Sequence, residues 1–312
     1  MNTGALEQTA RDAEEGFSTS RIEAFKRTID GPLAVVAAGG SGPAAAFWAQ
    51  LHERTTGHPA WPISPFALVD RGVPRGARVV LLSAAGSNHD ILQAARRAIE
   101  SKWPASAVVC RAESPLGQLV KEAGGADSAL EMAKPAAADL ILAVHAMVPL
   151  LVAAARVYGG VGPWAGHLSG PATVLSTERP RYVVSLGTGL AGPAAADFAY
   201  KCKESGLCPA WYDDVRDFAH GPFLTIHNVP EGALLAAFST GPQRDYMDRF
   251  VARLPETLRV ARITADGDGI GAGLSLFASS MRTLEPLARA ADVIYGPERI
   301  PAWGAAIHTL KS

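Results

Sequence analysis

The stretch LAVVAAGGSGPAAAFWAQLHE, residues 33–53, has the pattern of a single strand–turn–helix unit. Its first residues are continuously apolar, as expected of a strand that is buried on both faces of a sheet. A glycine-rich turn follows, and the alanine-rich remainder has the length and composition of a helix. Because such a unit is the building block of a parallel sheet, this stretch predicts an α/β fold.

The same order recurs in the second half of the chain. Residues 181–201, RYVVSLGTGLAGPAAADFAYK, again give a strand, a glycine turn and a Gly-Pro-Ala-Ala-Ala segment that opens a helix. This echo, roughly 150 residues after the first copy, indicates a duplicated chain of two domains. Further strand and helix patterns occur at 77–101, 106–114, 138–144, 233–254 and 258–266. We therefore expect two open parallel sheets, each flanked by helices.

Composition shifts divide the chain into parts. Residues 1–30 have the pattern of amphipathic helices, with Ile22, Phe25 and Ile29 on one stripe, and form an N-terminal helical segment. Residues 161–177 are rich in Gly and Pro, which is typical of a linker. The expected domains are therefore 31–160 and 178–312, the latter including the C-terminal tail.

The composition excludes several classes of function. The 312 residues carry a formal net charge of −1 and are 48% hydrophobic, which suits buried cores but neither an electrostatic nucleic-acid binder nor a membrane-surface protein. The polar start and the lack of an 18-residue apolar run favour a cytoplasmic location. Three cysteines without a C-x-x-C pair indicate neither a disulfide framework nor a zinc site, and no cofactor is expected.

A helix is predicted at 193–205, and it carries charged residues at regular spacing. Asp197, Lys201 and Glu204 recur at i, i+4 and i+7 and therefore share one face. Cys202 falls on another face and is expected to pack in the core. The charged stripe is either a solvated set of salt bridges or one wall of a cleft.

This helix and the segment after it resemble the double sugar-isomerase (SIS) proteins, including the isomerase half of glucosamine-6-phosphate synthase. In that family the helix reads E-G-x-L-K-x-K-E and a later segment reads E-x-x-H-G-P. Here Lys201 and Glu204 match the helix, Asp197 and Asp217 stand in place of glutamates, and His220 opens the His-Gly-Pro segment without any gap. The resemblance implies that each half of the chain is an SIS domain.

Two glycine turns in the first half are candidates for anion binding. In open α/β sheets, ligands bind outside the carboxyl ends of the strands, where turn amides and helix N-termini favour anions. SIS domains carry G-x-S in the first turn and S-x-S-G-x-T in the second, where they hold a sugar phosphate. The corresponding residues here are Gly40, Ser41, Ser83, Gly86, Ser87 and Asn88.

The second turn departs from the family pattern at two positions. Ala85 replaces a Ser and Asn88 replaces the Thr, which removes two hydroxyl groups. Either a phosphate is held by the backbone with Ser83, Ser87 and Asn88, or the ligand is not phosphorylated there. The resemblance adds Ser114, in a Ser-Pro-Leu turn, as a residue bordering the sugar; a plain strand-ending turn is the alternative.

The resemblance implies an aldose–ketose isomerase, deaminase or deglycase without a glutaminase domain. A carboxylate suits proton transfer between C1 and C2 of a sugar, so Glu204 is the expected base. His220 is the expected acid for ring opening, and Lys201 either stabilises enolate charge or keeps Glu204 ionised. By analogy His220 reaches the site from a neighbouring subunit, which implies a homodimer. The alternative is a non-catalytic sugar-phosphate sensor that regulates a partner protein.

Overall fold

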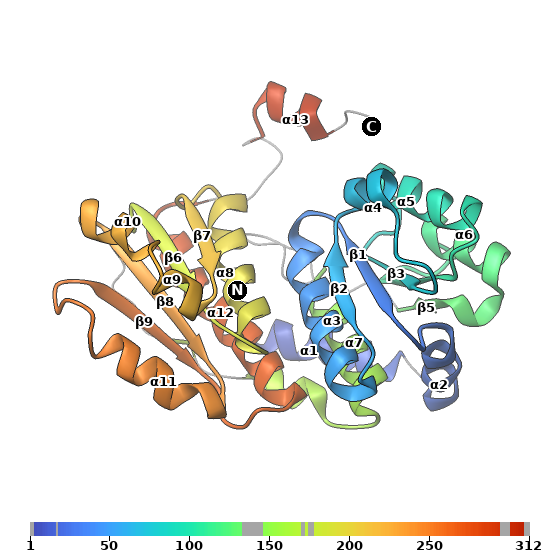
Figure 1. Cartoon of the computed structure of the whole chain (residues 1–312), viewed down its shortest axis with the longest axis horizontal. Coiled ribbons are helices and arrows are strands. Elements are labelled where there is room, and N and C mark those ends of the chain that lie inside the picture. The colour runs from blue at the N-terminus through green and yellow to red at the C-terminus, as the bar shows by residue number, and fades with distance from the viewer. Residues whose placement is uncertain are drawn as a thin grey trace. The chain divides into compact units, whose positions relative to one another are not determined.

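The computed structural model describes residues 3–16, 18–132, 146–169, 172–173, 178–293 and 300–308, and it divides into two compact units (Figure 1). The N-terminal unit contains the described residues of 7–165 together with 300–308. The C-terminal unit contains residues 3–6 and the described residues of 166–293. The sequence had placed 300–308 with the second domain, whereas this segment groups with the first unit.

The N-terminal unit is built on a five-stranded parallel sheet with the strand order β2-β1-β3-β4-β5. Its strands are β1 (Leu33–Ala37), β2 (Ala60–Ile63), β3 (Arg78–Ser83), β4 (Ala105–Val109) and β5 (Ala129–Glu131). The chain moves outward from β1 to β2 and then returns past β1 to β3. The carboxyl ends of β1 and β3 therefore form the topological switch point, where ligands bind in sheets of this kind.

Helices cover both faces of this first sheet. They are α3 (Gly42–Thr56), α4 (Pro65–Arg71), α5 (His89–Glu100), α6 (Pro115–Gly124) and α7 (Val148–Gly159), with short 3-10 turns at Gly39–Ser41, Ala126–Ser128 and Trp164–Ser169. Helices α4, α5 and α6 pack side by side on one face, whereas α3 and α7 pack together on the other. Small side chains at Ala94, Ala95 and Ala98 of α5 let Leu68 of α4 pack closely against that helix.

Two helices precede the first strand, α1 (Thr3–Glu15) and α2 (Thr19–Thr28). The hydroxyl oxygen of Ser18 accepts a hydrogen bond from the backbone N–H of Arg21 and so caps α2. Ile22, Phe25 and Ile29 are all buried, which confirms the predicted apolar stripe.

The C-terminal unit repeats the same topology. Its parallel sheet has the order β7-β6-β8-β9, which corresponds to β2-β1-β3-β4 of the first sheet. The strands are β6 (Tyr182–Leu186), β7 (Ala210–Asp213), β8 (Ala233–Ser239) and β9 (Arg259–Thr264). The predicted duplication is therefore visible in the order of the strands, and the α/β architecture of flanked parallel sheets is confirmed.

The helices of the C-terminal unit also form two layers. They are α8 (Ala191–Glu204), α9 (Val215–Phe218), α10 (Phe223–Asn228), α11 (Gly241–Val251) and α12 (Ile270–Ala290), and α13 (Ala302–His308) groups with the first unit. Phe198 of α8 packs edge to face on Phe238 of β8, with ring centroids 5.7 Å apart. Leu235 and Ala237 of the same strand point the other way, into the core beneath α9, α10 and α11. Helices α8 and α12, which pack together, therefore cover the opposite face.

Helix α8 matches the helix predicted at 193–205 and ends as the sequence indicates. Gly206 adopts a positive φ of 69°. The backbone N–H of Leu207 donates to the carbonyl of Cys202, and that of Gly206 donates to the carbonyl of Lys203. This pair of bonds is the Schellman motif, which satisfies the last carbonyl groups of a helix.

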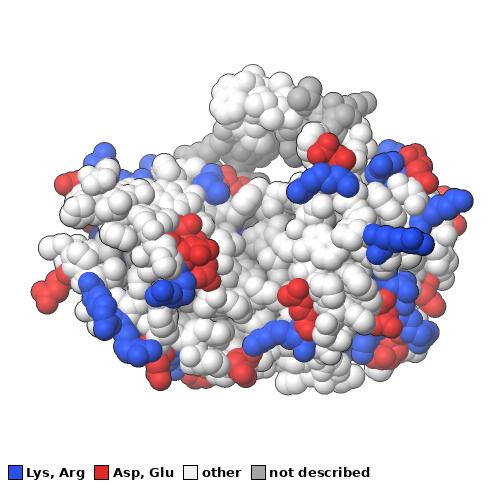
Figure 2. Space-filling model, in the orientation of Figure 1, with Lys and Arg blue, Asp and Glu red and all other residues white. Residues whose placement is uncertain are grey.

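Several predictions concern segments or properties that the fold only partly addresses. The strand expected at 138–144 lies outside the described residues. Within the part of the chain that is described, no helix has both the length and the apolar character of a membrane span. Acidic and basic side chains are interspersed on the face drawn in Figure 2.

Candidate functional site

The candidate anion-binding residues of the N-terminal unit gather at one edge of its sheet. Gly40 and Ser41 follow β1, residues 83–88 end and follow β3, and Ser114 follows β4. Strands β1, β3 and β4 are successive neighbours in the sheet, and all run in the same direction. The fold therefore brings these turns to the carboxyl edge, and the first two meet at the switch point between β1 and β3.

The turn after β3 leaves specific donors available. The hydroxyl oxygen of Ser83 accepts a hydrogen bond of 3.0 Å from the backbone N–H of Gly86, so its own O–H can still donate. The side-chain oxygen of Asn88 accepts from the N–H groups of Asp90 and Ile91, at 2.9 and 3.2 Å, and caps α5. The side-chain NH₂ group of Asn88 is thus the part that a ligand can use.

Two further hydroxyl groups border the same switch point. Ser87 is exposed and Ser41 is half-buried, and neither side chain forms a hydrogen bond within the described residues. Helix α5 begins directly after this turn, and the partial positive charge of a helix N-terminus favours an anion. The edge therefore presents hydroxyl and amide donors with a favourable dipole, which is the chemistry that a phosphate group requires.

Gly86, within this turn, packs closely against Ser114. Gly86 has a φ of +63°, and a Cβ atom there would lie only 2.6 Å from the Ser114 hydroxyl oxygen. Ser114 is completely buried, and its oxygen accepts from the N–H of Gly117 as the N-cap of α6. In this structure Ser114 therefore acts through capping and packing, and its contact with a sugar stays a prediction.

In the C-terminal unit, Asp197 and Lys201 form an ion pair inside the protein. Their side chains are 0% and 1% exposed, and the Lys201 ammonium donates to Asp197 Oδ1. The interpretation of these residues as a solvated stripe is therefore wrong. Only Glu204, of the three charged residues in the predicted stripe, is exposed. Asp197 Oδ2 has no hydrogen-bond partner among the described atoms. Burial raises the pKa of Asp197, and the Lys201 ammonium opposes that shift.

Glu204 and His220 stand on elements that cover opposite faces of the second sheet. Glu204 is the last residue of α8. His220 is exposed and lies between α9 and α10, with its backbone N–H donating to the carbonyl of Asp217 at 3.0 Å. The proposed base and the proposed acid therefore belong to different helical layers of the C-terminal unit.

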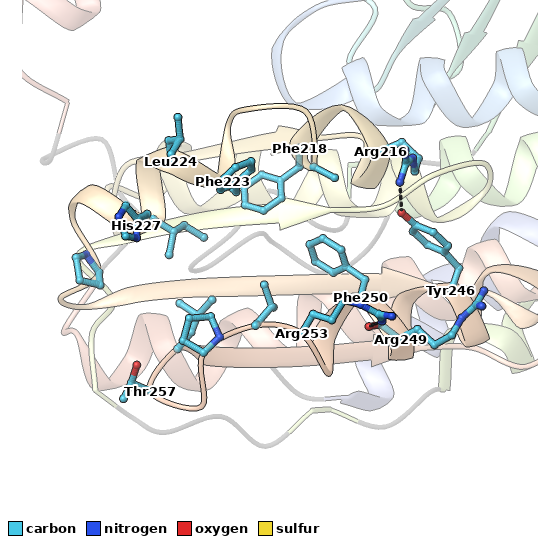
Figure 3. Close-up of a pocket in the computed structure, with 16 residues that line it drawn as sticks. Arg216, Phe218, Phe223, Leu224, His227, Tyr246, Arg249, Phe250, Arg253 and Thr257 are labelled. Carbon is cyan, nitrogen blue, oxygen red and sulfur yellow. Dashed lines mark hydrogen bonds between the residues drawn. The ribbon is translucent and has the colours of Figure 1, made fainter.

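A pocket in the C-terminal unit was not predicted from the sequence. It is a groove of about 830 Å³ in the C-terminal unit, between α9 and α10 on one side and α11 on the other (Figure 3). A sequence signal exists in hindsight, since Tyr246, Phe250 and Leu254 recur at helical spacing and α11 needs only part of that stripe to pack on the sheet. In the same described portion, no group of three or more His, Cys, Asp or Glu side chains could hold a metal ion.

Comparison with known proteins identifies the fold. No protein-family model matches this chain, and no curated protein matches it. It is similar to the solved structure of glucosamine-6-phosphate deaminase from Thermotoga maritima, with 16% identity, a TM-score of 0.69 and 93% of each chain covered. The C-terminal domain of glucosamine-fructose-6-phosphate aminotransferase from Francisella tularensis is similar over 95% of each chain, with 16% identity and a TM-score of 0.66.

A third similar structure is tagatose-6-phosphate ketose/aldose isomerase from Escherichia coli, with 15% identity, a TM-score of 0.65, and coverage of 92% of this chain and 93% of that one. Identities this low leave the fold as what the three structures share with this chain. The chain thus has the α/β architecture, with parallel sheets flanked by helices, that these three proteins have.

Proposed function

We propose that this chain consists of two tandem SIS domains and is an enzyme of the sugar-phosphate isomerase, deaminase or deglycase type. The observation that carries the proposal is the switch point of the N-terminal sheet, where the hydroxyls of Ser41, Ser83 and Ser87 and the amide of Asn88 meet the start of α5. The names of the three similar proteins all refer to sugar phosphates. Sugar phosphates are the class of ligand whose anionic group these donors suit.

The proposed reaction is an enolisation. The carboxylate of Glu204 removes a proton from C2 of the open sugar, the C–H electrons form an enediol with the carbonyl carbon, and the proton returns to C1. In an isomerisation the composition of the sugar is unchanged. In a deaminase or deglycase the amine leaves and water supplies the oxygen of the new carbonyl group, so neither route needs a redox partner. Lys201 lies one helical turn before Glu204, and we assign it the role of supporting that base.

Ring opening requires a proton on the ring oxygen, and we assign this step to His220 because an imidazole side chain can both donate and accept a proton. Since α8 and the α9–α10 segment cover opposite faces of one sheet, the proposal is that the partner subunit's His220 acts with Glu204 in a homodimer. A hybrid dimer of Glu204→Gln and His220→Gln chains tests this assignment. One intact site should form in that hybrid, whereas each variant alone should be inactive.

The test of the reaction is proton NMR in heavy water with hexose, hexosamine and fructosamine phosphates and their unphosphorylated forms. Wild type should exchange deuterium into C1 or C2, or release amine, and Glu204→Gln should lose this activity by about 10²- to 10⁴-fold while still binding. Glu100→Gln is the matched control, because Glu100 is also an exposed last residue of a helix, α5. Full activity in Glu204→Gln would remove Glu204 as the base.

A second candidate, a sugar-phosphate sensor, is favoured by the turn at 83–88. Ala85 offers no hydroxyl, and the oxygen of Asn88 is engaged in capping α5. A sensor should broaden the resonances of phosphorylated ligands without any deuterium exchange. In either case Ser83→Ala should weaken the binding of phosphorylated ligands about tenfold and leave the binding of unphosphorylated ones unchanged.

A further inference from the structure

The groove between α10 and α11 is a second site with a different chemistry. All sixteen residues that line it lie between positions 216 and 258, so the groove belongs to the C-terminal unit alone (Figure 3). It lies on the face of the sheet opposite α8, which carries Asp197, Lys201 and Glu204. Its volume, about 830 Å³, is in the range of pockets that hold small organic molecules.

The groove exists because the helical layer on this face is incomplete. The connection from β7 to β8 contains two short helices, α9 with 4 residues and α10 with 6, which are separated by residues 219–222. Helix α11 turns bulky side chains towards them, among them Tyr246 and Phe250. In Figure 3 the walls stand apart along the groove and are joined at one end by the 3.0 Å hydrogen bond from Arg216 to the Tyr246 hydroxyl.

The inner surface of the groove is largely apolar. Phe218 and Phe250 pack edge to face at its base, with centroids 6.1 Å apart, and Ile226 lies beside them. Two large apolar side chains on α10, Phe223 and Leu224, are 45% and 49% exposed. Covering apolar surface of this kind with a ligand removes it from water and so favours binding.

The charge of the lining has one sign. The lining includes three arginines, Arg216, Arg249 and Arg253, but no aspartate or glutamate. Arg249 and Arg253 donate only to main-chain carbonyls, those of Asp245 and Arg249, and within the described chain none of the three arginines forms an ion pair. The nearby Arg244 and Arg262, by contrast, are paired with Asp266 and Asp248.

We propose that this groove binds an amphipathic organic anion, whose aliphatic or aromatic body covers the phenylalanines and whose carboxylate or phosphate contacts Arg249 and Arg253. A guanidinium offers a planar set of donors that matches either head group. A sugar would leave the apolar base of the groove without a matching surface, so this site is separate from the proposed sugar chemistry. It requires neither Glu204 nor the turns of the N-terminal unit.

The test is isothermal titration calorimetry with three twelve-carbon probes below their micelle concentrations. Dodecanoate and dodecyl phosphate should bind saturably with one site per chain, and the stronger of the two identifies the preferred head group. Dodecyltrimethylammonium, with the same chain and the opposite charge, should bind at least tenfold more weakly. Arg249→Ala/Arg253→Ala should weaken the binding of both anions by at least about tenfold, because the loss of one charged hydrogen bond already lowers an affinity by about that factor.

Control variants distinguish the effect of positive charge from that of the guanidinium geometry. Arg96→Ala removes an exposed arginine from α5 of the other unit and should leave binding unchanged. Arg249→Lys/Arg253→Lys keeps the charge but loses the planar donors, so it should bind dodecanoate more weakly than wild type and more tightly than the double alanine variant. Circular dichroism should show the wild-type helix content in every variant. Equal binding of the cationic and anionic probes, unchanged affinity in the double alanine variant, or no saturable binding of either anion would each overturn the proposal. The last outcome would point to a protein partner.

Discussion

Helices α3 and α8 occupy the same place in the two sheets but bury opposite chemistry. Each follows the first strand of its sheet, and the two align at an offset of 150 residues, as Pro43 and Pro193 show. In α3 the aligned positions hold Phe47 and Leu51, which are 0% and 2% exposed. In α8 they hold the ion pair of Asp197 and Lys201, which is equally buried.

The comparison shows that stability alone does not explain the ion pair. Removing two charges from water costs several kcal/mol per ion, and a buried pair is often no more stabilising than apolar side chains of similar volume. Helix α3 shows that this layer of the fold accepts an apolar pair. Stability alone therefore gives no reason for Asp197 and Lys201, which agrees with the proposed role of Lys201 beside Glu204.

The largest effect should come from breaking the ion pair on one side. Lys201→Leu leaves the carboxylate of Asp197 buried without its counter-charge, and we expect a loss of about 3–5 kcal/mol in the free energy of unfolding of the C-terminal unit. Urea unfolding measures the loss, and hydrogen exchange by mass spectrometry assigns it to a unit. A change below about 1 kcal/mol would contradict the burial of this pair.

The matching double variant sharpens the same comparison. Asp197→Phe/Lys201→Leu transfers the apolar pair of α3 into α8 and should recover most of the stability lost in Lys201→Leu. It should nevertheless remain inactive in the deuterium exchange assay if Lys201 supports Glu204. An active double variant would show that the pair has a purely structural role.

This helix shows what a sequence can and cannot predict. Pro193 and Gly206 located α8 to within about two residues, because helix ends have local chemical signatures. Periodicity grouped Asp197 with Lys201 but gave no measure of what covers their face, since burial depends on α12 and the sheet, which are distant in sequence. The local pattern therefore predicted the pairing and not the burial.

The same limit applies to the two switch-point turns and to the groove. The residues of the first sheet's turns were predicted because glycine and hydroxyl residues directly follow apolar strands, and the parallel fold then places them at one edge. The groove depends on the spacing between α10 and α11. That spacing follows from how the side chains of different helices pack, so the stripe that includes Tyr246 and Phe250 indicates an apolar surface but not a groove.

A second prediction concerns the turn of the N-terminal unit that holds Ser83. Gly86→Ala should cost about 2–4 kcal/mol, because it combines a positive φ with a Cβ that would lie 2.6 Å from the Ser114 hydroxyl oxygen. Gly57→Ala is the control for strain alone, since Gly57 has a φ of +74° and nothing within 4 Å of the added atom. It should cost only about 1 kcal/mol.

The close approach to Ser114 can itself be tested. Gly86→Ala/Ser114→Gly removes the two Ser114 atoms that would lie within 2.7 Å of the added Cβ and leaves only Val109 Cγ1, at 3.2 Å, close to it. The two changes should therefore cost less together than the sum of their separate effects. Thermal unfolding of the four proteins provides the comparison. Strict additivity would show that Gly86 and Ser114 are not in contact.

The smallest expected effect concerns the next aligned pair, His52 in α3 and Cys202 in α8. The carbonyl of Gly31 can only accept, so His52 Nε2–H donates to it at 2.8 Å and Nδ1 accepts from the Tyr158 hydroxyl at 3.1 Å. Burial lowers the pKa of His52 below its ordinary value; His58 adds to this, whereas the Gly31 bond, Asp30 and Glu53 oppose it.

The folded protein therefore binds fewer protons at His52 than the unfolded chain does below about pH 6.5, so its stability should fall as the pH is lowered through that range. One such proton contributes a slope of at most about 1.4 kcal/mol per pH unit. His52→Gln, whose amide can donate and accept but does not titrate, should flatten the slope measured by urea unfolding between pH 7 and 5. His58→Gln, at the exposed neighbour, should change it much less. If His52→Gln keeps the full wild-type slope, the titrating group lies elsewhere and the neutral, doubly hydrogen-bonded state assigned to His52 is wrong.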